Sequence, residues 1–166
     1  MILTSNTSGL DMLIARIRKA RSELPRVTQA AAQRAGDTLA QQLSSAAPRG
    51  KNPGPPPPGD APGPLARSFS SLAEQSGSGA TLELKTNQPL KLQYVTKGTG
   101  VYVGKGVIRP LVKQALFWPS AAHPYRSVKG MKGKDFVKPV ISKANDVVKI
   151  EMQKAAQEID SILGGA

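Results

Sequence analysis

Residues 47–64 restrict the fold of this chain more than any other segment, because proline and glycine dominate them. Proline lacks a backbone N–H and fixes φ, so this segment can form neither a helix nor a central strand. Within it, four consecutive prolines favour a stiff polyproline stretch: Pro55, Pro56, Pro57 and Pro58. The segment therefore divides the chain. It fits a flexible surface loop, an arm that lies against a neighbouring subunit, or a ligand for a proline-binding module.

The residues before this segment carry apolar side chains at helical spacing. The first apolar stripe consists of Leu10, Leu13, Ile14, Ile17 and Leu24. The second, between about residues 25 and 46, consists of Val27, Ala31, Ala35, Leu39 and Leu43. The pattern predicts two helices with a kink or short break at Pro25. Gly36 would weaken an isolated helix by about 1 kcal/mol relative to alanine, so we expect another backbone to approach closely there.

The residues that follow the Pro/Gly-rich segment change to strand-like patterns. Residues 81–85 alternate between apolar and polar side chains, as a half-buried strand does, and residues 76–79 predict the turn before it. Residues 90–97 fit either a strand or a short helix. The glycines of residues 98–106 predict a loop.

The last third of the chain predicts a hairpin and a helix. Residues 111–118 fit a strand, with residues 125–128 as its hairpin partner. From Phe136 the apolar stripe predicts one long amphipathic helix that ends before Gly164. The element order predicts a single α+β domain over residues 1–166. It would contain an antiparallel sheet of about four strands, with N-terminal helices and a long C-terminal helix packed on it.

The charge is concentrated in the middle of the chain. The whole sequence has 23 basic and 11 acidic residues, whereas residues 85–143 contain twelve basic residues and one acid, Asp135. Such a segment faces nucleic acid, an acidic partner or bulk solvent. The candidate basic surface consists of Lys97, Arg109, Lys113, Arg126, Lys129, Lys132 and Lys134.

The sequence offers little material for catalysis. It contains no cysteine, and its one histidine, His123, precedes a proline in a predicted turn. Residues 99–106 approach the phosphate-binding pattern GxxxxGK[ST], but Thr99 replaces the first glycine and Gly106 replaces the final hydroxyl. We expect no enzyme activity, no cofactor and no metal site. No apolar run reaches the roughly 18 residues of a membrane span, and residues 1–6 lack the basic region and apolar run of a secretory signal, so we expect no membrane association.

Several short motifs follow one another in a recognisable order. Ala47-Pro48 ends the second predicted helix, and Gly63-Pro-Leu65-Ala-Arg67-Ser68 precedes the first predicted strand. Tyr94-Val-Thr-Lys-Gly98-Thr99 ends in "GT". Leu116-Phe-Trp118 falls in a predicted strand, and Phe136-Val-Lys-Pro139 begins the last helix. Over roughly residues 10–155, this order resembles the head–tail joining proteins of long-tailed bacteriophages, which include neck, tail-completion and minor tail proteins. The Pro-rich insertion and Pro64 depart from the family pattern.

The resemblance implies a structural virion protein that is not an enzyme. Such proteins form a ring, commonly of six subunits, between the head connector or adaptor and the tail-tube or tail-terminator proteins, and genomic DNA passes through the channel. The chain would be made and assembled in the cytoplasm of the host bacterium and end in the neck or tail of the virion. A tail terminator or related assembly subunit is a neighbouring possibility.

The resemblance, together with the general use of loops for contacts, indicates which residues would meet a neighbouring subunit or partner. These are Pro55, Pro56, Pro57, Pro58, Tyr94, Gly98, Thr99, Tyr102 and Lys105. We expect the basic middle to face an acidic neighbouring ring rather than DNA, because tight phosphate binding would hinder ejection. The alternative function is a basic, sequence-nonspecific nucleic-acid-binding protein.

Overall fold

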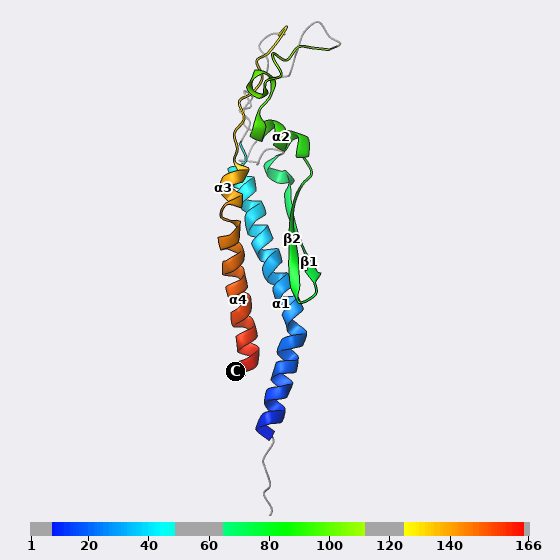
Figure 1. Cartoon of the computed structure of the whole chain (residues 1–166), viewed down its shortest axis with the longest axis vertical. Coiled ribbons are helices and arrows are strands. Elements are labelled where there is room, and N and C mark those ends of the chain that lie inside the picture. Colours follow the sequence, from blue (N-terminus) through cyan, green and yellow to red (C-terminus); the bar gives the residue numbers. More distant parts are fainter. Residues whose placement is uncertain (1–7, 49–64, 112–124, 165–166) are drawn as a thin grey trace, which may run out of the picture. The chain divides into compact units, whose positions relative to one another are not determined.

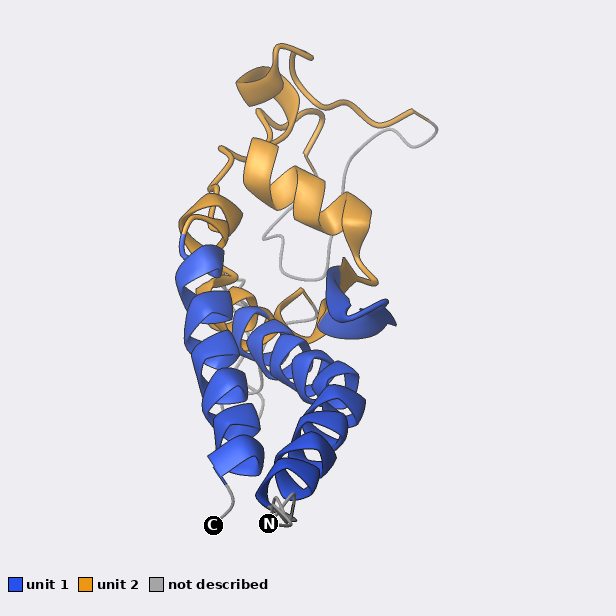
Figure 2. Ribbon diagram, turned by 60° about the horizontal axis from the view of Figure 1, so that its bottom comes forward, with its two compact units in different colours: residues 1–39, 70–84, 143–166 blue, residues 40–69, 85–142 orange. Residues whose placement is uncertain are grey.

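The computed structural model describes residues 8–48, 65–111 and 125–164 (Figure 1). The chain is α+β, with an N-terminal helix, a two-stranded antiparallel sheet and a C-terminal helix. It divides into two compact units (Figure 2): unit 1 contains residues 1–39, 70–84 and 143–166, and unit 2 contains residues 40–69 and 85–142. The elements in order are α1 (Ser8–Ala46), the 3₁₀ turn η1 (Ala66–Ser68), β1 (Phe69–Ser76), β2 (Gly79–Thr86), α2 (Pro89–Lys97), the 3₁₀ turn η2 (Gly100–Val103), α3 (Val137–Ile141) and α4 (Ala144–Gly164).

In unit 1, helix α1 is the middle of three layers, with the β1–β2 ribbon on one side and α4 on the other (Figure 1). The side that meets α4 includes Val27, Ala31 and Arg34. The side that meets the ribbon includes Gln33 and Gly36. These two sets lie about half a turn apart around a helix of 3.6 residues per turn. The C-terminal helix was expected on the sheet, and that expectation is wrong in this respect: its described contacts are with α1.

Gly36 provides the space that lets the ribbon approach α1. A Cβ atom at this position would lie 2.7 Å from the Cβ of Ser71 on β1 and would also meet the Leu82 side chain on β2. The close approach expected from the sequence is therefore present, but side chains of the ribbon make it rather than another backbone. A mid-helix glycine is accepted here because any larger residue would separate the two layers.

Glutamines of α1 satisfy the backbone of β1 at Ala73. The Ala73 N–H donates to Gln33 Oε1 (3.0 Å), and Gln29 Nε2 donates to the Ala73 carbonyl (3.1 Å). Gln33 Nε2 also donates to Ser71 Oγ (2.9 Å). Side-chain amides here make the bonds that another strand would make, which protects part of a strand edge from unwanted pairing.

The other side of α1 forms the core of unit 1 with α4. Val27, Ala31 and Ala155 are buried together, and Met152 and Ile159 pack against them. Alanines lie on both helices, so the two backbones can approach closely at Ala31 and Ala155.

Helix α1 is continuous through Pro25, so the two helices expected on either side of it are one helix, and the expected break is absent. Proline removes one helix hydrogen bond and crowds the preceding turn. Side chains on both sides of it, Ala20 and Val27, are nevertheless buried. Packing of this face therefore keeps the helix intact where local preference alone would end it.

In unit 2, the segment after the Pro/Gly-rich stretch is fixed by buried polar and aromatic contacts. Ser68 Oγ donates to the Leu65 carbonyl (2.6 Å) and lies 2.7 Å from Thr86 Oγ1. The rings of Phe69 and Phe136 meet edge to face, with centroids 6.2 Å apart. The edge-to-face arrangement is a favoured geometry for an aromatic pair.

The strand predictions are confirmed in part. Residues 81–85 lie within β2, and the turn before it is present, but residues 90–97 form helix α2. Only two strands occur among the described residues, rather than about four. Residues 125–128 form no continuous strand; Val128 pairs with Ile108 in an isolated antiparallel bridge, and the predicted strand partner, residues 111–118, falls mostly outside the described residues. The last helix divides into α3 and α4 at Ser142 and Lys143.

Candidate interaction surfaces

The glycine-rich loop of unit 2 is fastened to residues 128–134 by backbone hydrogen bonds. Thr99 N–H donates to the Met131 carbonyl (2.8 Å), and Met131 N–H donates to Thr99 Oγ1 (2.9 Å). Val101 N–H donates to the Lys129 carbonyl (3.0 Å). We call this paired region, residues 95–101 and 129–134, the glycine clasp. It brings together predicted contact residues and predicted basic residues that lie about thirty positions apart.

Glycines make the clasp possible, because the two segments approach backbone to backbone. A Cβ on Gly98 would lie 2.6 Å from the Met131 carbonyl oxygen, and one on Gly130 would lie 2.7 Å from the Thr99 carbonyl carbon. Both glycines also have positive φ, at 88° and 94°. A side chain at either position would therefore disrupt both the contact and the backbone geometry.

A cavity of about 490 Å³ lies beside the clasp, and several predicted contact residues line it. Tyr94, Lys97, Gly98, Thr99 and Lys105 contribute from the sequence prediction, with Gln93, Gly100, Val103, Val107 and Ile108. Tyr102 is exposed and is not part of this lining. The sequence therefore identified about half of the residues around this cavity.

The basic residues around the clasp lack acidic partners in the described part of unit 2. Lys97, Arg109, Arg126, Lys129, Lys132 and Lys134 are all exposed. Asp135, the one acid of residues 85–143, accepts hydrogen bonds from the N–H groups of Val137 and Lys138 at the start of α3 (both 3.1 Å). Its carboxylate is thus used as a helix cap, and the surface stays strongly positive.

Six of the residues named from the sequence lie outside the described residues: Pro55, Pro56, Pro57, Pro58, Lys113 and His123.

In unit 1, the first turns of α1 expose the apolar stripe that the helical spacing predicted. Residues 9–19 are all exposed. The N-terminal stripe consists of Leu10, Leu13, Ile14 and Ile17, and their exposed fractions run from 37% to 57%. Arg16 Nη1 lies 3.5 Å from the Gly164 carbonyl, so α4 ends beside Arg16 and the preceding turns of α1 extend past it (Figure 1). Such a contiguous apolar face on a helix is a candidate interaction surface.

A groove of about 280 Å³ lies between α1 and α4, further along the same face of α1. We call it the α1–α4 groove. Its lining consists of Leu24, Val27, Thr28, Met152, Ala155, Ala156, Ile159 and Asp160. Sequence analysis missed this groove, because it depends on which turns of the two helices face each other.

An ionic cluster joins the two helices beside the groove. Lys154 Nζ donates to Glu151 Oε1 (2.6 Å), and Arg34 Nε donates to Glu151 Oε2 (2.9 Å). These bonds, the one from Lys154 first, lower the pKa of the Glu151 carboxyl below its usual value. The Glu151 side chain is only 10% exposed, and the two hydrogen bonds favour its charged form against the cost of burial. The i,i+3 spacing of Glu151 and Lys154 was the one signal of this cluster in the sequence.

Two kinds of site are absent from the described ranges. No group of three or more histidine, aspartate or glutamate side chains there could hold a metal ion. No helix there is long and apolar enough to span a membrane.

Comparisons with known proteins give no match: no family model, no curated protein and no solved structure is similar to this chain.

Proposed function

We propose that this chain is a structural subunit of a phage neck, where copies form a ring that joins the DNA-filled head to the tail tube. The exposed N-terminal stripe is the observation that carries the proposal. Four apolar side chains on projecting helical turns favour association, and packing between subunits would bury them. The motif order described above supplies the family and the expected six-fold ring.

The proposal includes several finer points of the family resemblance. The subunit is not an enzyme, and it contacts connector or adaptor proteins on one side and tail-tube or tail-terminator proteins on the other. It is assembled in the bacterial host and remains in the virion. A sheet of about four strands also belongs to the proposal, with β1 and β2 as two of them.

Light scattering on the purified protein tests the ring. We expect one defined species near six times the subunit mass of 17.5 kDa, unchanged by nuclease and by protein dilution over a tenfold range. A monomer at every concentration, in low and high salt, would contradict self-assembly into a ring.

A sequence-nonspecific nucleic-acid-binding protein is the second candidate, favoured by the unneutralised cations around the glycine clasp. Phosphate contacts release counterions, so binding to duplex DNA would weaken steeply as salt rises. We expect instead weak DNA binding and a preference for an acidic protein surface. A steep salt dependence combined with a monomeric protein would favour this second candidate over the ring.

A further inference from the structure

We propose that the N-terminal stripe of one copy packs into the α1–α4 groove of a second copy, so that subunits join head to tail. The inference rests on the proposed ring and identifies the contact that would build it. Both surfaces belong to unit 1, and neither requires the molecule to unfold in order to be reached.

The two surfaces match in chemistry. The stripe presents leucine and isoleucine side chains that are about half exposed. The groove is lined mainly by apolar groups, including Met152, Ala155 and Ile159. Placing such side chains in the groove removes apolar surface of both copies from water, which is the main driving force for association.

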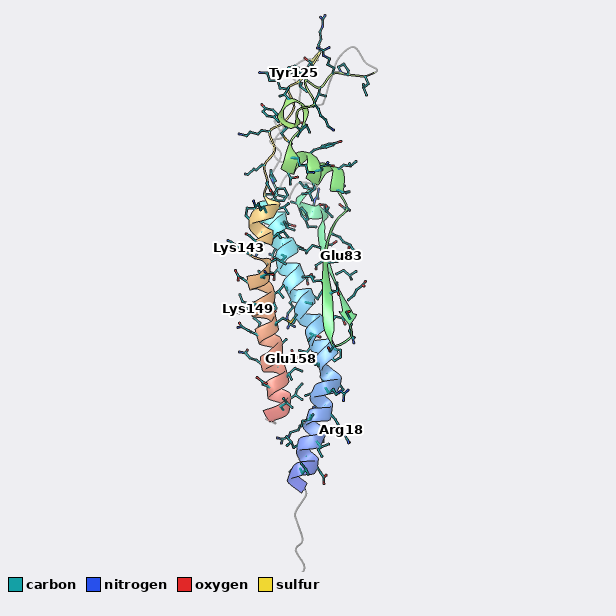
Figure 3. The ribbon with its side chains drawn as sticks, viewed as in Figure 1. Arg18, Glu83, Tyr125, Lys143, Lys149 and Glu158 are labelled. Carbon is teal, nitrogen blue, oxygen red and sulfur yellow. The ribbon has the colours of Figure 1, made fainter. Side chains whose placement is uncertain are left out.

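The charged residues beside the two surfaces favour a contact between stripe and groove over a contact between two stripes. Arg18 and Arg21 flank the stripe, and neither forms an ion pair within the described residues. The groove includes Asp160, and Glu158 lies two residues before it on α4, where it is 3.8 Å from Arg26 of the same copy (Figure 3). Two stripes packed on each other would place like charges together, whereas a stripe in a groove brings Arg18 and Arg21 towards Asp160.

The placement of the two surfaces makes the contact repeatable. A copy that gives its stripe to a neighbour keeps its own groove open, because groove and stripe occupy successive parts of one face of α1. A contact between two different surfaces generates a ring when its rotation closes, and a filament when it does not. This arrangement is the kind of contact that a ring requires.

Two single variants and a matched control test the contact by size-exclusion chromatography with light scattering. Leu13→Asp places a charge on the stripe, and Ala156→Arg fills the groove with a cation. Ile150→Asp is the control: Ile150 is 52% exposed, Leu13 is 50% exposed, and Ile150 lies about half a turn from Ile159 around α4. We expect the wild type and Ile150→Asp to be oligomers, and Leu13→Asp and Ala156→Arg each to be monomers.

Mixing the two monomeric variants gives the sharpest outcome. Leu13→Asp keeps an intact groove and Ala156→Arg keeps an intact stripe. Their equimolar mixture should form a complex of twice the 17.5 kDa subunit mass that grows no further. If both variants and the wild type are all oligomers, the proposed stripe-to-groove contact is wrong, although the proposed ring is not contradicted. A monomeric Leu13→Asp with an oligomeric Ala156→Arg would instead indicate a symmetric stripe-to-stripe contact. A monomeric wild type would overturn both proposals.

A second measurement covers the case in which a charged variant loses its helical structure. The sequence contains no cysteine, so introduced thiols report contacts without background. Ile17→Cys and Ala156→Cys, mixed as separate proteins and oxidised, should give a disulfide-linked dimer on a non-reducing gel. Ile17→Cys mixed with Ile150→Cys should not. Equal cross-linking in both mixtures would overturn the proposal.

Discussion

The two halves of α1 have the same kind of apolar pattern but opposite surroundings. The second half buries Val27, Ala31, Ala35, Leu39 and Leu43, whereas residues 9–19 of the first half are all exposed. Periodicity identifies the apolar face of a helix. Whether that face is covered depends on other elements, and here α4 ends beside Arg16. The comparison teaches that an amphipathic stripe predicts a contact without saying which chain provides it.

Truncation of one leucine in each half gives the largest expected contrast. Leu39 is 2% exposed, so Leu39→Ala should lower the free energy of unfolding by about 3 kcal/mol through lost burial and a cavity. Leu13→Ala should lower it by about 0.5 kcal/mol or less in dilute protein. Urea unfolding at several protein concentrations measures both. The Leu39→Ala loss should not depend on concentration, whereas the Leu13→Ala loss should increase with it. Equal losses at low concentration would remove the distinction between the halves.

The two glycines of α1 give a contrast of intermediate size. Gly36→Ala places a Cβ 2.7 Å from Ser71 Cβ, an atom fixed to the β1 backbone. We expect a loss of about 1 to 2 kcal/mol, although alanine favours a helix by about 1 kcal/mol. Gly9→Ala is the matched control, since its Cβ meets nothing within 4 Å, and thermal unfolding should show no loss. A gain in stability for Gly36→Ala would show that the ribbon does not pack on this half of α1.

The smallest expected effect concerns the charges that join α1 to α4, and it depends on pH. The folded-state pKa of Glu151 lies below its unfolded value because Lys154 and Arg34 donate hydrogen bonds to it. As the pH falls, the Glu151 carboxyl is therefore protonated in the unfolded chain at a higher pH than in the folded chain. The contribution of Glu151 is complete above the unfolded pKa of about 4.3 and is lost as the pH falls from there through the folded pKa.

At pH 7, Glu151→Gln should lower the free energy of unfolding by about 1 kcal/mol and should flatten its pH dependence below about pH 4. The control Glu158→Gln changes a more exposed carboxyl, 3.8 Å from Arg26, and should have an effect of about 0.5 kcal/mol or less. Urea unfolding between pH 3 and pH 7 measures both variants. Parallel pH profiles for wild type and Glu151→Gln would contradict the assignment.

Sequence patterns predicted the elements whose signals are local. The alternation of residues 81–85 and the turn before it indicated β2, and the stripe after Phe136 indicated the C-terminal helix. Residues 90–97 could not be assigned in the same way, because a short apolar segment fits both periods. Pro89 at the first turn of α2 supplies the fixed φ that favours the helix.

The features that sequence analysis missed depend on distant partners. Pro25 stays inside α1 because the face around it is packed. Gln29 and Gln33 bond to Ala73, more than forty positions from Gln29, and no local signal indicates such a pair. The same distinction between local signals and distant partners applies to the candidate surfaces. Composition identified the basic residues and the glycine-rich loop, but not the groove or the exposure of the stripe.

The glycine clasp has a consequence for how this protein can change over evolutionary time. Its loop is shaped by backbone-to-backbone contacts, and the lysines around it point into solvent without acidic partners. We expect substitutions at Gly98 and Gly130 to be eliminated by selection, whereas Lys105, Lys129 and Lys132 can be exchanged with little loss of folding. A lineage could thus acquire a new binding partner by altering side chains on a loop whose conformation is inherited unchanged.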